Sequence, residues 1–230
     1  MWSKHTVRSH LPPHFTPADL PLAVRFGSHR TTLRRLRADD AGRLMEFFAS
    51  HSEETVYQRY GYAGVHLTPE QAQRLVGVDQ TRDAALGVFE DFSGHTRLIA
   101  IGRYCLAPER NEAEAAFVVH EQRRNLGIGR TLLAALLAIA RDKKLDRLVA
   151  ELRQDNAPML HVLHSAGATF ESIPGTSSLA ATLPVSSAPT QSPPPGHNEK
   201  PAGAWPADAA ARAALRIERA GLALNRLPLP

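Results

Sequence analysis

The sequence has a single cysteine and no long hydrophobic run, and each of these absences excludes a class of protein. Because Cys105 stands alone, no internal disulfide can form. The most apolar stretch, residues 131–140, ends at Arg141, whereas a membrane helix needs roughly 18 apolar residues. The first residues also lack the apolar segment of a secretory signal. We therefore expect a cytoplasmic protein without a membrane span.

The folded part of the chain also lacks an excess of positive charge. The whole sequence has 27 Lys and Arg against 23 Asp and Glu, a net charge of +4. Residues 1–37 have seven basic and one acidic side chain, whereas residues 38–185 have 15 basic and 19 acidic ones. A protein that binds nucleic acid gathers Lys and Arg on its folded surface. We therefore predict no nucleic-acid partner.

Proline is scarce in the centre of the chain, and its distribution predicts the domain boundaries. Only four of the 17 prolines lie within residues 22–183. We predict a flexible basic arm over 1–29, one folded domain over 30–185, a disordered Pro-rich linker over 186–206, and an Ala-rich helix or tail over 207–230. The linker has too few apolar residues to offset the entropy cost of ordering. The tail is a candidate contact for a protein partner.

Within the domain, local patterns predict strands and helices in a mixed order. The expected strands cover 31–37, 84–91, 97–106, 114–120 and 145–152, with a final strand inside 177–185. Helices are expected after Asp39 or Asp40, from Thr68 and Pro69, and over 127–144 and 156–166. This order predicts an α+β (mixed α/β) fold, with one sheet flanked by helices, rather than a doubly wound sheet.

A polar turn with two glycines, residues 122–131, joins the strand at 114–120 to the longest helix. The free N–H groups at a helix N-terminus favour an anion, and glycine lets a ligand approach the backbone. Arg123, Arg124 and Arg130 add positive charge. These features predict a phosphate site, although a purely structural helix start with glycines for close packing stays open. The spacing excludes a Walker loop and a dinucleotide fingerprint.

The turn resembles the pyrophosphate-binding turn of the GCN5-related N-acetyltransferase (GNAT) family, which reads Gln or Arg, two residues, Gly, one residue, and Gly or Ala. Arg124, Gly127 and Gly129 match this pattern. The context also matches, with a strand before, a long helix after, and a helix led by Asn156 that ends at Gly167. The resemblance covers about residues 30–183 and implies a twisted, mostly antiparallel central sheet flanked by helices.

The sequence looks closest to the Pat-type branch, the protein lysine acetyltransferases, through segments 52–60, 67–70 and 111–117. This likeness implies acetyl-CoA as co-substrate, with no metal, and a protein lysine as acceptor. Two alternatives stay open: an acetyltransferase for small-molecule amines, and a non-catalytic acyl-CoA-binding regulatory module.

The resemblance also assigns binding roles to residues of the turn and the strand before it. Backbone N–H groups of residues 124–129 would hold the pyrophosphate, and the backbone of Val118 and Val119 would pair with the pantetheine arm. The Thr131 hydroxyl would lie near the phosphates. The implied binding set is Val118, Val119, Arg124, Asn125, Leu126, Gly127, Ile128, Gly129, Arg130, Thr131 and Asn156.

By the same resemblance, Glu114 stands where Pat-type enzymes place a general base, ten residues before Arg124. A lysine amine, with a pKa near 10.4, must lose a proton before it can attack. Glu112 is the alternative base, because residues two apart share a face of a strand. Leu163 occupies the position of the tyrosine that serves as acid in many members, so no general acid is expected.

Other titratable residues receive weaker assignments. His120 ends the strand beside the turn and is a candidate ligand contact, whereas His161 and His164 are expected to face solvent. Cys105 lies between apolar neighbours and is expected to be a small buried side chain. None of the eleven histidines has a partner at a spacing typical of metal ligands, so we predict no metal site.

Overall fold

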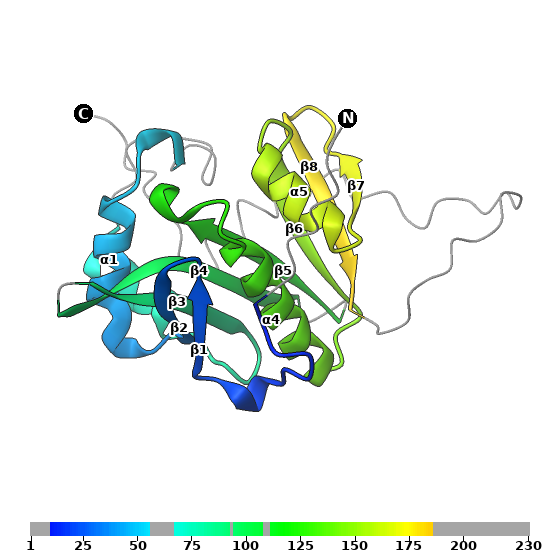
Figure 1. Cartoon of the computed structure of the whole chain (residues 1–230). Helices are drawn as coiled ribbons and strands as arrows, with labels where there is room; N and C mark the ends of the chain where they lie inside the picture. The colour runs from blue at the N-terminus through cyan, green and yellow to red at the C-terminus, as the bar shows by residue number, and fades with distance from the viewer. Residues whose placement is uncertain (1–9, 56–66, 93, 108–110, 186–230) are drawn as a thin grey trace, which may run out of the picture.

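The computed structural model of the chain describes residues 10–55, 67–92, 94–107 and 111–185, which form an eight-stranded sheet with helices on both faces (Figure 1). The strand order is β1-β2-β3-β4-β5-β6-β8-β7. Neighbouring strands are antiparallel, except for β5 and β6, which are parallel. The strands are β1 (Leu22–Phe26), β2 (His29–Arg35), β3 (Ala84–Phe92), β4 (His95–Ala107), β5 (Glu112–Val119), β6 (Arg147–Arg153), β7 (Thr169–Ser172) and β8 (Ser178–Pro184). The predicted mixed fold with a mostly antiparallel sheet is confirmed.

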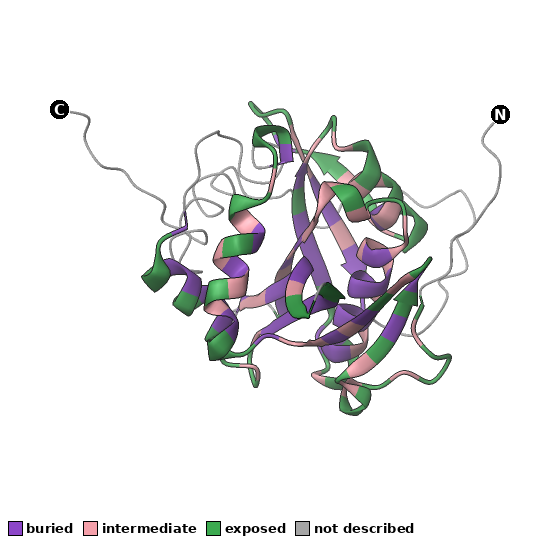
Figure 2. Cartoon of the chain, turned by 60° about the vertical axis from the view of Figure 1, so that its left-hand side comes forward, coloured by how far each residue is buried: buried purple, intermediate pink, exposed green. Residues whose placement is uncertain are grey.

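The helices divide between the two faces of this sheet. The α-helices are α1 (Ala41–Ala49), α3 (Pro69–Val76), α4 (Ile128–Asp142) and α5 (Ala157–Ser165), and the 3₁₀ turns are η1 (Pro17–Asp19), η2 (Ala38–Asp40) and η3 (Glu121–Arg123). Helices α1 and α3 pack on one face, and α4 and α5 belong to the apolar cluster on the other. Buried residues gather along the central strands, while the outer helix surfaces are exposed (Figure 2). This arrangement encloses a separate core on each face.

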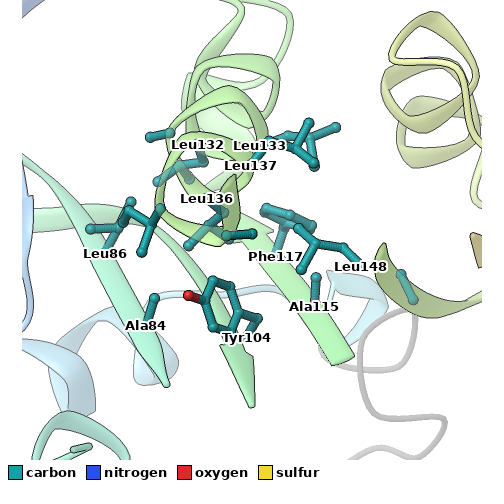
Figure 3. Packing of buried hydrophobic residues seen from close by; sticks show 14 of the residues in the cluster. Ala84, Leu86, Tyr104, Ala115, Phe117, Leu132, Leu133, Leu136, Leu137 and Leu148 are labelled. Carbon is teal, nitrogen blue, oxygen red and sulfur yellow. The ribbon is translucent and has the colours of Figure 1, made fainter. Parts of the chain in front are cut away.

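The larger core forms where α4 crosses the centre of the sheet (Figure 3). Leu132 and Leu136 are fully buried over Tyr104 of β4, with Phe117 of β5 beside them. Each buried leucine contributes about 1.5–3 kcal/mol of transfer free energy. A Cβ on Gly102 would lie 3.1 Å from Phe117 Cδ1 and 3.3 Å from Leu132 Cβ. The missing side chain therefore lets α4 approach the sheet closely.

The sheet contains an interruption between β5 and β6. The parallel ladder has three pairs, Glu112 with Arg147, Ala113 with Leu148, and Glu114 with Val149. Beyond Glu114, β5 continues beside β4, and β6 pairs with β8. Within the described residues, the rest of β5 therefore has a strand neighbour on one side alone. The two halves of the sheet part at Glu114.

The predicted arm over residues 1–29 is wrong in its second half. Residues 22–26 form β1, in which Val24 is 7% exposed and Phe26 is fully buried. Leu11, Phe15 and Leu20 also pack against the core. The alternation of apolar residues over 22–26 predicts a half-buried strand by its period of two, and the positive charge around it obscured that signal.

Most expected elements of the domain are present, with shifts of a few residues at their ends. Strand β7 was missed because it has only four residues and its side chains are largely exposed. The predicted linker and tail, residues 186–230, lie outside the described residues, as do residues 56–60 of the Pat-like segment 52–60. No helix in the described ranges is long and apolar enough to cross a membrane.

The end of the folded domain gives a first prediction. Val185 is 1% exposed, its N–H donates to Asp146 O at 2.9 Å, and its carbonyl accepts from Arg141 Nε at 3.0 Å. A chain cut after Val185 should keep the melting temperature of the full chain and its affinity for acetyl-CoA. A chain cut after Thr182 also loses Leu183, which is 1% exposed. Its free energy of unfolding should fall by about 2–5 kcal/mol or more, because removing a buried aliphatic side chain typically costs that much.

Thermal unfolding followed by circular dichroism, together with calorimetric titration of acetyl-CoA, checks both truncations. Failure of the chain 1–185 to fold or bind would show that the boundary after Val185 is wrong.

Candidate active site

The predicted phosphate turn has unusual backbone geometry. Asn125 has φ 62° and Gly127 has φ 83°, both in the left-handed region. The first helical hydrogen bond of α4 runs from Thr131 N to Gly127 O. In the part of the chain that the structure describes, no group accepts from the backbone N–H groups of residues 125–130. Alternating left- and right-handed residues at a helix N-terminus form an anion-binding concavity. The turn can therefore cradle a phosphate through its backbone.

The apolar side chains of the turn, Leu126 and Ile128, are directed away from this cradle. Ile128 is 1% exposed, and Leu126 packs against the main core. A Cβ added to Gly129 would lie 3.9 Å from Val119 Cγ2 and 4.0 Å from Val162 Cγ2. Gly129 therefore faces a space with ordinary room between β5 and α5. Ligand binding at residues 125–129 would depend on the backbone rather than on side chains.

The three arginines of the turn take different positions. Arg123 binds Glu90 of β3, Arg124 Nη2 donates to the Thr55 hydroxyl, and Arg130 Nη2 lies 3.4 Å from His161 Nε2. The Arg124 backbone N–H donates to Glu121 O at 3.2 Å. The predicted contact of this N–H with the pyrophosphate is therefore wrong, because the group already bonds to Glu121 O. The N–H groups without a described acceptor begin at Asn125.

Two other predicted binding residues have structural partners. Thr131 is fully buried, its hydroxyl donates to Gly127 O at 3.0 Å, and its oxygen accepts from His10 N at 3.2 Å. Its predicted place near the phosphates is wrong, because this inward hydrogen bond turns the hydroxyl toward the core. Asn156 Oδ1 accepts from Met159 N at 3.3 Å and caps α5. The Asn156 side chain is thus explained by helix capping.

The open side of β5 presents backbone groups next to the turn. His120 N donates to Ile99 O of β4 at 3.0 Å. Because backbone groups alternate in direction along a strand, those of Val118 also point toward β4. Those of Val119 and Phe117 point toward β6, which has already diverged. The expected pairing with an extended ligand is therefore available at Val119 but not at Val118.

Glu112 and Glu114 lie on the same face of β5, as predicted, in different surroundings. Glu112 is 2% exposed, and its Oε2 accepts from Arg147 Nε at 2.7 Å. Glu114 is half-buried opposite Cys105, at the last pair of the β5–β6 ladder. Arg103 lies on this face too, and its Nη2 donates to Cys105 Sγ at 3.1 Å. Glu114 is thus the glutamate that lies where the strands part.

Cys105, expected to be a small buried side chain, and Leu163, at the position of the family's tyrosine, differ in burial. Cys105 is partly buried, and burial raises the pKa of its thiol. Leu163 is fully buried, while His161 and His164 are exposed. The described residues contain no group of three His, Cys, Asp or Glu side chains that could hold a metal ion.

A hydrogen-bonded network that sequence reasoning missed joins the turn to the segment after α1. Glu121 Oε1 accepts from Ser52 N at 2.8 Å and from the Ser52 hydroxyl at 2.7 Å. Burial acts to raise the pKa of Glu121, but hydrogen bonds from Thr55 and Ser52 outweigh it and lower the pKa to about 2. With the bond from Arg124 to Thr55, the network holds both ends of η3. No local pattern joins residues 69 positions apart.

His51 and His120 pack together beside this network. Their ring centroids are 5.3 Å apart, and Nδ1 of His120 accepts from Gln122 N at 3.3 Å. Burial lowers the pKa of His51. In the structure His120, predicted to contact ligand, caps the first turn of η3.

Comparisons with known proteins agree with this geometry. A family model described as an acetyltransferase (GNAT) domain matches residues 30–169. The GNAT domain of S. lividans PAT is 26% identical, with a TM-score of 0.61, and the match covers 69% of this chain and 93% of that one. YncA, a putative acetyltransferase from Salmonella typhimurium solved with its cofactor acetyl-CoA, is 18% identical, with a TM-score of 0.56 and coverage of 69% and 96%. A ribosomal-protein-alanine N-acetyltransferase from Brucella melitensis is 20% identical, with a TM-score of 0.50 and coverage of 65% and 96%.

The two glycines of the turn give a second prediction. Gly127→Val should abolish acetyl-CoA binding, because a branched side chain at φ 83° strains the turn and enters the ligand's space. Gly129→Val should fold but also lose binding, since its side chain would fill the space between Val119 and Val162. Gly129→Ala is the control and should keep stability and affinity, because the added methyl meets ordinary contacts. Calorimetric titration measures this, and unchanged affinity in folded Gly127→Val would contradict the phosphate cradle.

The lowered pKa of Glu121 gives a third prediction. A carboxylate with a folded-state pKa of about 2 adds stability above its ordinary pKa, and that stability is lost as the pH falls toward 2. Glu121→Gln should therefore reduce the free energy of unfolding at pH 7 by about 1–2 kcal/mol, after allowance for solvent screening. The difference from the wild type should shrink between pH 5 and pH 3 in urea titrations. The exposed Glu151 provides the control, as Glu151→Gln should change stability little at either pH.

Proposed function

The chain belongs to the GNAT family of acetyltransferases, and from this premise we propose that it acetylates a lysine side chain of a protein, with Glu114 as the general base. Family membership makes the protein an acetyl-CoA-dependent N-acetyltransferase. The observation that supports the proposal is the position of Glu114, half-buried where β5 and β6 part, on the strand that leads into the phosphate turn.

The residues around the turn suit acetyl-CoA. Its pyrophosphate would lie against the N–H groups of residues 125–130, which have no acceptor among the described residues and favour an anion. Val119 would offer its outward backbone N–H and carbonyl to the amides of the pantetheine arm, which extends into the gap between the strands. Acetyl-CoA supplies an activated thioester, whose carbonyl carbon accepts an amine and whose sulfur leaves. The chain supplies orientation and proton transfer.

Glu114 would remove the proton that prevents attack. A lysine ammonium has a pKa near 10.4, so few amines are neutral at pH 7 without a base. Val118 lies four residues further along β5 on the same face, about 13 Å away at the rise of an extended strand. A base at Glu114 thus stands beside the acyl end of an extended ligand whose phosphates occupy the turn. The proton would pass to the carboxylate directly or through water.

The surroundings of Glu112 favour Glu114 for this role. Glu112 is almost fully buried and is bound to the half-exposed Arg147, so accepting a proton would break this ion pair. Glu114 is more exposed and lies at the opening between the strands. The two residues share a face but differ in access.

The leaving group needs no acid from the protein. Leu163, at the position of the family's tyrosine, is fully buried and cannot donate a proton. A thiol with a pKa near 8.5 leaves readily as a thiolate, so this absence is compatible with turnover.

The choice of a protein lysine is supported by likeness rather than by an acceptor pocket. The Pat-like segments include Ser52 and Thr68. The match with the GNAT domain of S. lividans PAT covers 93% of that domain. A screen of lysine peptides, candidate proteins and small amines for CoA release tests the acceptor class, and mass spectrometry locates the acetyl group. Transfer to small amines alone would favour that alternative, and no turnover with any acceptor would favour the non-catalytic module.

Proton transfer by Glu114 gives a fourth prediction. Glu114→Gln should keep acetyl-CoA affinity and lower kcat by about 10² to 10⁴, the usual contribution of a positioned base. A higher pH should partly restore the rate, because more of the amine is then neutral without help. Glu112→Gln is the matched control on the same face. It should lower the melting temperature, through loss of the ion pair with Arg147, and leave kcat near the wild-type value.

Steady-state kinetics from pH 6 to 9 checks both variants. Loss of kcat in Glu112→Gln with retention in Glu114→Gln would transfer the base role to Glu112.

A further inference from the structure

A buried carboxylate that the catalytic proposal does not use lies beside the phosphate turn. Glu90, near the end of β3, is 4% exposed. Its Oε2 accepts from Arg97 Nη2 at 2.7 Å and from Arg123 Nη2 at 3.0 Å, and its Oε1 lies 2.6 Å from His29 Nδ1. A single carboxylate therefore joins three segments: β2, β4 and the turn.

All three nitrogens of the Arg123 guanidinium make hydrogen bonds, two of them to Glu90. Its Nε and Nη2 lie 3.3 Å and 3.0 Å from Glu90 Oε2, and its Nη1 donates to Gln122 O at 3.1 Å. The side chain is 13% exposed. Arg123 therefore cannot direct the same N–H groups at a bound phosphate while it holds Glu90. Its backbone ends η3, two residues before the free N–H groups begin at Asn125.

We propose that Glu90 is a positioning residue for acetyl-CoA binding, which acts through Arg123 to hold the phosphate cradle in its binding conformation. Arg97 and Glu90 are cross-strand neighbours in the β3–β4 ladder, so the anchor is part of the rigid sheet. A preformed cradle avoids the entropy cost of ordering the turn when ligand arrives. The inference rests on the acetyl-CoA role of the turn and is independent of Glu114.

The charge state of Glu90 suits this role. Burial acts to raise its pKa, but hydrogen bonds from Arg123 and Arg97 outweigh burial and hold the pKa below its ordinary value. The carboxylate is therefore ionised at neutral pH. Replacing it with an amide would leave the two arginines close together without their shared anion. Repulsion would then displace Arg123, because Arg97 is held in the β3–β4 ladder and Arg123 lies outside the sheet.

The competing explanation is that Arg123 acts as a counter-charge that reaches the phosphates directly. The two roles differ in what they require of the side chain. Anchoring to Glu90 uses the guanidinium fork, which lysine cannot reproduce, whereas a point charge near phosphate can be supplied by lysine. The two explanations also differ in the double variant. If Glu90 and Arg123 act through each other, the losses of acetyl-CoA affinity in the single variants are not additive.

The test is a double-mutant cycle on the dissociation constant of acetyl-CoA, measured by calorimetric titration. Glu90→Gln and Arg123→Met should each weaken binding by about tenfold or more, the scale expected when a binding group is misplaced by a fraction of an ångström or more. The double variant should bind no more weakly than the weaker single variant. Arg123→Lys should resemble Arg123→Met, and the kinetic loss should fall on KM for acetyl-CoA rather than on kcat.

Glu112→Gln is the matched control, because it also removes a buried carboxylate from an arginine, at the far end of β5 from the turn. It should lower the melting temperature and leave acetyl-CoA affinity unchanged. Unchanged affinity in Glu90→Gln, additive losses in the double variant, or full rescue by Arg123→Lys would overturn the proposal. Arg123→Lys keeps the charge balance at Glu90, so the test does not depend on the folding of Glu90→Gln. Because affinity for acetyl-CoA is the readout, failure here would leave the proposed base and acceptor unaffected.

Discussion

The loss of pairing between β5 and β6 beyond Glu114 is the constraint on which the candidate active site depends. Unpaired backbone groups inside a sheet are costly, so strands normally continue side by side. Here β6 pairs with β5 over three residues only, and among the described residues no strand accepts the outward groups of Phe117 and Val119. A ligand with its own amides, extended between the strands, would satisfy these groups. The same divergence brings Glu114 to the edge of the opening and leaves the turn beyond Val119 free of the second half of the sheet.

The turn itself is a second case of backbone groups left for a ligand. Six consecutive N–H groups, residues 125–130, find no acceptor among the described residues. Such a conformation is held from outside, because left-handed Asn125 is intrinsically unfavourable. Glu121 with Ser52 and Thr55 holds η3 from one direction, and Arg123 is bound to the sheet through Glu90. These contacts stabilise the folded protein and also fix the shape of the cradle. The same hydrogen bonds therefore contribute to both folding stability and ligand affinity.

The two glutamates of β5 illustrate how environment assigns different roles to identical side chains. They lie two residues apart on one face, but Arg147 of β6 reaches Glu112 at 2.7 Å. Protonation of the buried Glu112 carboxylate would cost this ion pair, and its burial leaves little access for a substrate amine. Glu114, at the last pair of the ladder, is more exposed than Glu112. The point at which β6 stops following β5 therefore separates a structural glutamate from a candidate base.

The sequence by itself determined the main elements, the mixed fold and the location of the ligand turn, because these follow from local signals. Apolar periodicity defines α4, a capping box begins α3 at Thr68, and two glycines mark the turn. Tertiary structure decided the rest. Only the fold showed that Thr131 turns inward, that the Arg124 N–H is already bonded, that Val119 rather than Val118 faces the open side, and that Glu90 holds Arg123. Each of these depends on partners far away in the chain or on the direction of a single bond, and no local pattern of residue types encodes either.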